Sequence, residues 1–407
     1  MIGRTSRVIL IAGAVAVAPL SRLMADAPST QDVAVQAKPP VTAVNVGERA
    51  QQLIDQGLVF MKTQQLADGD FAPPQAPPGL SAIALKAFVQ DSAYSTTKDD
   101  FLKKGYANLI SYQVGSGGIF KDMLATYNTA IAVSALAAAN DPSFKPALDK
   151  AVGYLRGMQW TDTITGPHGE SIKDPKKSNF EGGFGYGRHS RPDLSNTQFA
   201  LDALHDAGVK PDDPAYAEAL KFVTRCQNFS ETNDQPWAGN DGGFVYSAGD
   251  AGDSEAGSYT GPDGRKMWRS YGSMTYAGFK SLIYAGLSHQ DVRVKAALGW
   301  IKRHWTLDEN PGLRDNDPTQ ALHGLYYYFH AMARALVAYG EPVLVDDAGT
   351  PHDWRVEMTA KIASLQRPDG SWAGEKRWME DNPVLATSYN VLALEEIVQD
   401  LKVHPAK

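Results

Sequence analysis

Two aspartates in the stretch RDNDPTQALHG (314–324) have a spacing that can do chemistry. Asp315 and Asp317 stand two residues apart and are followed by Thr319. A carboxyl group that is kept neutral in an apolar cavity can donate a proton to a substrate. The alternative is structural, because Asp317 as an N-cap with Pro318 in the first helical position is an ordinary way to begin a helix. We favour the helix start and keep Asp317, with Asp315 behind it, as the candidate proton donor.

A second set of candidates is aromatic and lies in or beside segments that we expect to be helices. Aromatic rings stabilise cations, stack on sugar rings or fill a core, and we favour core packing for most of them. If the helices enclose a cavity, its candidate lining is Tyr127, Tyr271, Tyr276, His323, Tyr326, Tyr327, Tyr328 and Tyr389. His323 and His330 share a helix face, but two histidines without a third ligand make a poor metal site. No metal site is expected.

The segments that must position these residues carry a repeated motif. SLQRPDGSWAG (364–374) and TQQLADGDFAP (63–73) both contain a glutamine, then Asp-Gly, then an aromatic residue two positions after the glycine. Self-similarity of this kind is the signature of a repeat architecture. Weaker copies occur at 111–120, at 157–162 with 180–187, at 225–230 with 240–247, and at 300–313, where the glutamine is lost.

Each copy lies between two helical segments of different character. The preceding segment is amphipathic, as in PAYAEALKFVTRC (214–226), which is typical of a helix with one solvated face. The following segments are rich in alanine and apolar on nearly all sides, which indicates helices enclosed by others; they are 79–88, 127–139, 195–208, 271–287, 323–340 and 386–397. Six outer–inner hairpins that close on themselves give an all-α (α/α)6 toroid over residues 47–400. Residues 401–407 are a short tail.

The motif residues have structural roles at the turn between the layers. Gly370 permits a tight turn with positive φ, and Asp369 can hydrogen-bond the local backbone. The amide of Gln366, at the end of an outer helix, can satisfy exposed helix-terminal groups. Trp372 then covers the end of the helix hairpin. We therefore predict that this tryptophan stabilises the fold and does not contact a ligand.

The Gln–Gly–aromatic pattern resembles the QW repeat of squalene and oxidosqualene cyclases and the related repeats of protein prenyltransferase β subunits. The resemblance covers roughly residues 47–400, and the copies at Gln65 and Gln366 match best. It implies an (α/α)6 barrel whose central cavity holds an isoprenoid in the enzymes of this family. Such a resemblance indicates the fold more strongly than the activity.

The chemistry of the family has to be checked residue by residue. Prenyltransferases bind zinc through an Asp-x-Cys at the head of an inner helix and a later histidine, but the matching stretch here offers Ser270, Gly272 and Ser273. The last inner segment has no histidine, so neither zinc nor another cofactor is expected. Squalene–hopene cyclases use Asp-x-Asp-Asp followed by Thr-Ala. The nearest substitute here is the Asp315 and Asp317 pair, with Pro318 in the third acidic position.

Three classes of function remain. The first is an exported, terpene-cyclase-like protein that binds a small hydrophobic, isoprenoid-like ligand in a central cavity. Because the acids and zinc ligands of the family are missing, its catalysis stays open. If it is an active enzyme, we expect a terpene cyclase or mutase. The second is a carbohydrate-active hydrolase or lyase, which for hydrolysis needs opposed carboxylates roughly 5 to 9.5 Å apart. The acids near the repeat loops are Glu181, Asp193, Asp241 and Asp317. The third is a non-catalytic exported interaction ring.

The N-terminal segment predicts export. Arg4 and Arg7 precede an apolar run over 8–20, and Ala25-Asp26-Ala27 then fits a cleavage point, so we assign residues 1–27 to a signal peptide. The run is shorter than the roughly 20 apolar residues that span a bilayer. Residues 28–46 follow as a flexible linker. We therefore expect a periplasmic or extracellular protein.

Composition narrows the partners. With 407 residues, 43% hydrophobic and 21% charged, the chain can form a large core. Its net charge of −7 gives no basic patch for nucleic acid, so no nucleic acid is expected. Cys226 is the single cysteine, so packing and not an internal disulfide must hold the fold together. Peripheral contact with a membrane stays open.

Overall fold

The structure, a computed structural model, describes residues 40–71, 78–161, 179–187 and 190–406. The expected signal peptide (1–27) and most of the expected linker (28–46) lie outside the described residues. From Pro40 onward the chain forms one unit with its own core. The first helix begins at Val46 and the last ends at Val403.

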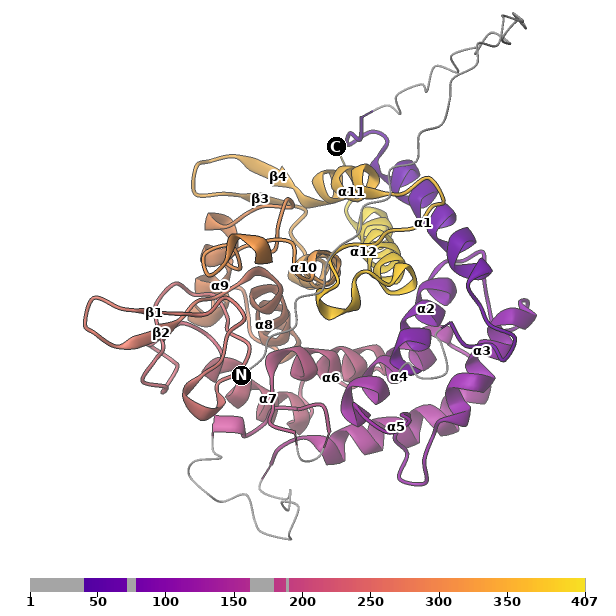
Figure 1. Ribbon diagram of the computed structural model, residues 1–407, viewed down its shortest axis with the longest axis horizontal. Helices are drawn as coiled ribbons and strands as arrows, with labels where there is room; N and C mark the ends of the chain where they lie inside the picture. Colours follow the sequence, from indigo (N-terminus) through magenta and orange to yellow (C-terminus); the bar gives the residue numbers. More distant parts are fainter. Residues whose placement is uncertain (1–39, 72–77, 162–178, 188–189, 407) are drawn as a thin grey trace, which may run out of the picture. The chain divides into compact units, whose positions relative to one another are not determined.

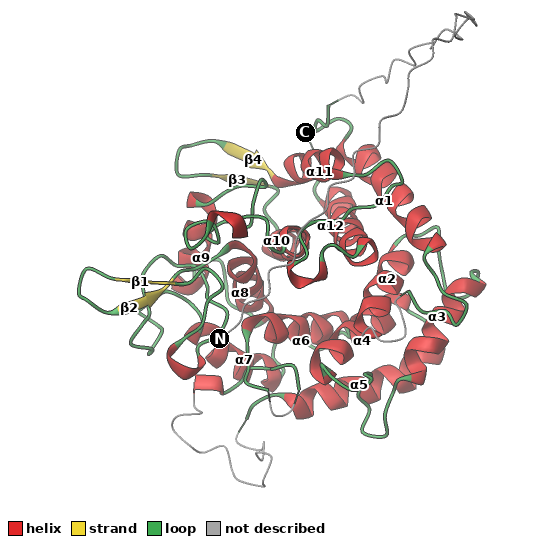
Figure 2. Cartoon of the chain, in the orientation of Figure 1, coloured by secondary structure: helices red, strands yellow, loops and turns green. Residues whose placement is uncertain are grey.

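The described residues form twelve α-helices that alternate between an outer and an inner layer (Figures 1 and 2). The outer helices are α1 (Val46–Thr63), α3 (Asp100–Ser111), α5 (Lys145–Met158), α7 (Pro214–Arg225), α9 (Val292–Arg303) and α11 (Trp354–Leu365). The inner helices are α2 (Pro78–Gln90), α4 (Ala125–Ala139), α6 (Leu194–Asp206), α8 (Gly272–Tyr284), α10 (Leu325–Tyr339) and α12 (Pro383–Val403).

The inner helices form a closed ring. Each packs against the next inner helix along the chain, and α12 packs against α2, which completes the circle (Figure 1). All six inner segments that the sequence predicts are helices of this inner ring. The expected (α/α)6 toroid is therefore confirmed.

Two short β-hairpins lie in the loops between helices. Strands β1 (Ser258–Thr260) and β2 (Lys266–Trp268) pair antiparallel between α7 and α8. Strands β3 (Val343–Val345) and β4 (Pro351–Asp353) pair in the same way between α10 and α11. Neither hairpin belongs to the repeated unit.

A glycine with positive φ marks each of the six repeat turns; these are Gly69, Gly117, Gly182, Gly242, Gly312 and Gly370. A side chain would clash there as well as strain the backbone. A Cβ on Gly69 would lie 2.8 Å from the Lys104 carbonyl oxygen of α3, and one on Gly370 would lie 2.6 Å from the Gln56 carbonyl oxygen of α1. The last turn thus packs on the first outer helix, so the outer layer closes too.

The repeat glutamines connect successive repeats. The Gln159 side-chain amide donates to the Gly182 carbonyl of its own turn and to the Ala215 carbonyl in the first turn of α7, both at 2.9 Å. Equivalent pairs of bonds are made in three other repeats, by Gln65, Gln113 and Gln227. The acceptors thus lie in the turn and in the first turn of the next outer helix. The weakest copy keeps its Gly312 turn without a glutamine.

The aromatic position is buried, as predicted. Trp372 is fully buried, and its indole N–H donates to the Ile362 carbonyl at 2.9 Å. Its backbone N–H donates to the hydroxyl of Thr387 on α12. The same bond, from the turn to a Ser or Thr near the start of the inner helix, recurs with Ser81, Thr129, Thr197 and Thr275. This hydroxyl links the two layers in five of the six repeats.

The inner helices differ from expectation in one respect. They carry buried polar side chains as well as apolar ones, among them Lys86, Gln198, Asp202, Lys280 and Arg334. A buried charge is tolerated only where it is paired and hydrogen-bonded. These side chains meet at the centre of the ring.

Candidate functional site

Ion pairs link the inner helices at the centre of the ring, and two of them join helices that are not neighbours. The Lys86 ammonium of α2 lies 2.7 Å from the Asp206 carboxylate of α6, and the Arg334 guanidinium of α10 lies 2.8 Å from the same carboxylate. The Lys280 ammonium of α8 contacts both Asp202 at 2.7 Å and the Gln198 amide oxygen at 2.6 Å. Because the two bonds to Asp206 span the ring, this network fills its centre with paired charges.

The network changes the pKa values of its members. Burial alone would raise the pKa of Asp206, but the neighbouring charges of Arg334 and Lys86 hold it well below its usual range. Burial lowers the pKa of Lys280 to about 8, although Asp202 acts in the opposite direction. Burial and the nearby cations also lower the pKa of His330 well below its usual range, so this histidine is neutral. The centre is therefore polar.

Aromatic rings form a second layer across the ring, nearer the N-terminal ends of the inner helices. The ring of Phe199 lies 5.2 Å from Tyr127 and 5.9 Å from Tyr327, centroid to centroid, and Tyr327 lies 5.9 Å from Tyr389. These rings come from α4, α6, α10 and α12. The Tyr327 hydroxyl lies 3.1 Å from the Ser195 hydroxyl. Three of the eight predicted cavity residues thus meet at the axis, with Phe199, which the sequence analysis missed.

The other five predicted cavity residues lie elsewhere. Tyr276 and Tyr328 pack edge to face, and the Tyr328 hydroxyl donates to the Thr306 carbonyl beyond α9, so this pair lies between the layers. Tyr326 is buried and its hydroxyl donates to the Ala373 carbonyl before α12. Tyr271 is buried at the start of α8, and His323 is half-exposed beside Trp378.

Asp315 and Asp317 lie on the outside of the loop before α10. Asp315 is exposed, and the Asp317 carboxylate accepts bonds from the Thr319 backbone N–H at 2.9 Å and the Thr319 hydroxyl at 2.8 Å. These bonds lower the pKa of Asp317. Asp317 therefore caps a single 3-10 turn (Pro318–Gln320) and not the inner helix α10. Helix α10 begins only at Leu325, seven residues after Pro318.

A second partial match to the cyclase pattern escaped the sequence analysis. Residues 193–197 read Asp-Leu-Ser-Asn-Thr, and unlike 315–319 they do begin an inner helix, α6. The Asp193 carboxylate caps α6 by accepting from the Asn196 backbone N–H at 2.8 Å and from its side-chain amide at 2.7 Å. Burial raises the pKa of Asp193 to about 7. Ser195 stands where the pattern has its second aspartate, so no acid occupies that position.

The remaining acids near the repeat loops are engaged locally. Glu181 pairs with Lys221 at 2.7 Å. Asp241 accepts from the Ser270 hydroxyl and the Gly243 backbone N–H, each at 2.8 Å. Each carboxylate bonds its own loop or a neighbouring outer helix. These predicted acids are thus engaged in local hydrogen bonds and ion pairs.

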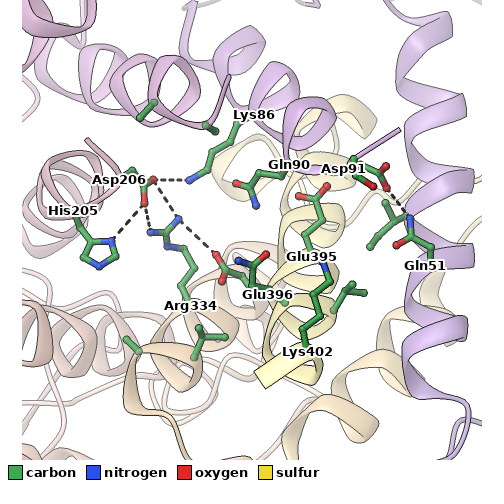
Figure 3. Close-up of a pocket in the computed structure, with 18 of the residues that line it drawn as sticks. Gln51, Lys86, Gln90, Asp91, His205, Asp206, Arg334, Glu395, Glu396 and Lys402 are labelled. Carbon is green, nitrogen blue, oxygen red and sulfur yellow. Dashed lines mark hydrogen bonds and ion pairs between the residues drawn. The ribbon is translucent and has the colours of Figure 1, made fainter. Parts of the chain in front are cut away.

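A pocket of about 580 Å³ opens at the C-terminal end of the inner helices, beside the ion-pair network (Figure 3). This volume falls within the usual range for small-molecule sites. Its polar lining includes Gln51, Lys86, Gln90, Asp91, His205, Asp206, Arg334, Glu395, Glu396 and Lys402. Its aromatic wall is the Tyr284 ring, on which His205 stacks at 4.2 Å between centroids. Carboxyl groups and amides thus share this lining with cationic side chains and with apolar ones such as Ile54 and Val337.

Two carboxyl groups in this pocket differ in their surroundings. Asp91 accepts from the Gln51 side-chain amide at 2.7 Å and from the Ala93 backbone N–H at 2.8 Å. Glu395 is only 8% exposed, and neither of its carboxyl oxygens has a hydrogen-bond partner among the described residues. Burial, reinforced by Asp91 and Glu396, raises the pKa of Glu395 well above its usual range. Glu395 is therefore a buried acid with a raised pKa, in contrast to the hydrogen-bonded Asp91.

A sequence signal for this end of the ring was available. Gln198, Asp202 and Asp206 stand four residues apart in a segment that is otherwise mainly apolar, so they lie on one helix face. Lys86, Arg334 and Glu395 interrupt equally apolar segments. Polar residues inside enclosed helices must find partners, which points to the axis of the ring.

Neither a cluster of metal ligands nor a membrane-spanning helix occurs among the described residues. The histidine, cysteine and acidic residues of this part of the chain form no group of three that can hold a metal ion. Cys226 is buried at the end of α7, and burial raises the pKa of its thiol well above the usual value. Among the described helices, none is both long enough and apolar enough to cross a bilayer.

Solved structures of two functional kinds share this fold. The type II terpene cyclase MstE from Scytonema, in complex with geranylgeranyl dihydroxybenzoate, superposes with a TM-score of 0.51 at 14% identity, covering 88% of this chain and 100% of the cyclase. An α-1,6-mannanase of Salegentibacter, in complex with α-1,6-mannotriose, gives 0.52 at 12% identity over 87% and 99%. An unsaturated glucuronyl hydrolase specific for heparin gives 0.53 at 11% identity over 90% and 100%.

These similarities establish the α/α toroid and nothing finer, because fold does not imply function. No protein-family model matches the sequence, and no curated protein matches it either. The chain is thus a toroid similar in fold to terpene cyclases and to carbohydrate-active hydrolases. Its function must be argued from its own side chains.

Proposed function

We propose that this chain is an exported toroid that binds a small polyhydroxylated ligand of the carbohydrate class in the pocket of Figure 3. The observation that carries the proposal is the lining, in which carboxyl groups, amides, an arginine and a histidine converge on about 580 Å³. A sugar hydroxyl both donates and accepts, so it suits a wall that offers both kinds of partner. The stacked His205 and Tyr284 rings add a flat surface for a sugar ring.

The mannanase and the glucuronyl hydrolase lend support of a limited kind. Both act on sugars with the same toroid, so the fold can carry such a site. The proposed site does not use the repeat-loop acids that the sequence analysis singled out. It uses Asp91 and Glu395, at the opposite end of the inner helices.

The second candidate is an isoprenoid-like ligand, as in the terpene cyclases. The aromatic layer of Tyr127, Phe199, Tyr327 and Tyr389 favours it, because such rings can stabilise carbocations. Against it, these rings contact one another across the axis, and the layer beneath them is a network of paired charges. A hydrocarbon in that layer would separate the ion pairs, which is costly. We therefore rank the polar ligand first.

A binding screen separates the two candidates. The mature chain is tested on a glycan array and, in parallel, by calorimetry with geranylgeraniol. Ala138 lines the pocket, so Ala138→Trp should abolish sugar binding by filling it. The control Ala348→Trp lies on the exposed β3–β4 turn and should bind normally. Binding of geranylgeraniol but of no glycan, unaffected by Ala138→Trp, would favour the second candidate.

A further inference from the structure

We propose that the pocket recognises its ligand through a primary amine, as an amino sugar presents, and that Glu395 receives the ammonium group. This inference rests on the proposed function, because it specifies the ligand of the same pocket. It starts from the one carboxyl group of the pocket lining that is buried without a partner.

The partner pattern singles out Glu395. Its neighbour on α12, Glu396, lies 3.7 Å from the Arg334 guanidinium, and Asp206 is paired with both Arg334 and Lys86. Glu395 is more deeply buried than either of these two acids, yet both its oxygens are without a hydrogen-bond partner in the described structure. Figure 3 shows its side chain directed toward the side of the pocket where Gln90 and Asp91 lie. A buried polar group left unpaired costs free energy, which a ligand donor can recover.

The charges around Glu395 favour a cationic donor. Asp91 and Glu396 act on Glu395 as negative charges and outweigh the opposite effect of Lys86, which is paired with Asp206. Lys402 lies on the exposed rim. An ammonium group offers three N–H donors and a positive charge. The three donors and the positive charge of an ammonium group suit the side of the pocket where the carboxyl groups of Asp91 and Glu395 lie. A neutral hydroxyl supplies a donor but no charge.

Binding of the amine releases a proton. Without a bound amine, burial and the acidic neighbours raise the pKa of Glu395 and so favour its protonated form. When an ammonium ion enters, the O–H bond of the Glu395 carboxyl group breaks, the proton passes to solvent, and a carboxylate–ammonium pair remains. No oxidant or second reactant is needed. By linkage, amine binding should strengthen as pH rises toward the pKa of Glu395.

The test compares two disaccharides, cellobiose and the glucosamine dimer, which differ at position 2 by a hydroxyl or an amine. Calorimetry at pH 6, where the amine is charged, is run in two buffers of different ionisation enthalpy. We expect the glucosamine dimer to bind at least about tenfold more tightly and to release about one proton per molecule bound. Glu395→Gln should remove both the preference and the proton release, so that the glucosamine dimer binds no more tightly than cellobiose. The exposed Glu231→Gln is the control.

Each other outcome is informative. Equal affinity for the two disaccharides would leave the sugar site standing and overturn the amine inference. A preference and a proton release that survive in Glu395→Gln would overturn the role of Glu395. If neither disaccharide binds, and the glycan array is also blank, the proposed function fails and this inference with it. Thermal unfolding of each variant shows that the comparison is between folded proteins.

Discussion

Glu380 provides a sharp test of how burial competes with helix capping in this fold. It lies before α12, is fully buried, and its carboxyl oxygen accepts from the Tyr327 backbone N–H of α10 at 2.7 Å. Burial raises its pKa from 4.5 to about 7, although the first amides of α10 act in the opposite direction. We therefore expect the folded chain to hold a proton on Glu380 at pH 5 and to lose it at pH 8.

The sign and size of the effect follow from linkage. Between pH 4.5 and pH 7 the unfolded chain has lost this proton and the folded chain retains it, so the free energy of unfolding falls as pH rises. One pKa unit is worth about 1.4 kcal/mol, so the loss between pH 5 and pH 8 is roughly 2 to 3 kcal/mol. Glu380→Gln cannot titrate. Relative to the wild type, it should therefore be more stable at pH 8 than at pH 5 by that amount.

Urea unfolding followed by tryptophan fluorescence measures this difference at pH 5, 6, 7 and 8. The substitution itself lowers the free energy of unfolding, because the NH2 group of the glutamine faces backbone N–H donors. That loss of stability is the same at every pH. Glu375→Gln, at an exposed position in the same loop, should show no pH-dependent difference. A stability difference for Glu380→Gln that stays constant from pH 5 to pH 8 would refute the reasoning. It would mean that the α10 amides keep the carboxyl group ionised.

Four further predictions concern the repeats, the acids and export. Trp372→Ala should lower the free energy of unfolding by about 3–5 kcal/mol, as for other large buried aromatics, and leave glycan binding intact. Gln159→Ala removes two bonds between repeats and should cost about 2–3 kcal/mol, whereas the same change at Gln64, which lies at the end of α1, should cost little in urea unfolding. Asp317→Asn should cost at most about 1 kcal/mol without altering ligand binding, and squalene should give no cyclic product with either protein. Intact-mass analysis of exported protein should place the mature N-terminus near Pro28; retention of residues 1–20 in a membrane fraction would indicate an anchor instead.

Much of the fold could be predicted because its causes are local. A tight turn packed against a helix backbone requires glycine, so Gly69 and Gly370 reveal the repeat in the sequence itself. The burial of Trp372 follows from its place directly after that turn. The two helix layers can also be predicted from the sequence, because an enclosed helix must be apolar on nearly all sides whereas an outer helix can be amphipathic. Even the weak copy at 300–313 keeps its turn.

The candidate site could not be predicted in the same way, because its residues meet only when the ring closes. Lys86 and Asp206 are 120 residues apart and lie on inner helices that are not neighbours. Spacing along one helix places Gln198, Asp202 and Asp206 on a common face, but it cannot say which cation faces them. The sequence by itself determined the toroid, its turns and its layers. Only the tertiary structure decided that the centre is filled with paired charges and that Glu395 is left unpaired, because burial and pairing are set by side chains that arrive from distant helices.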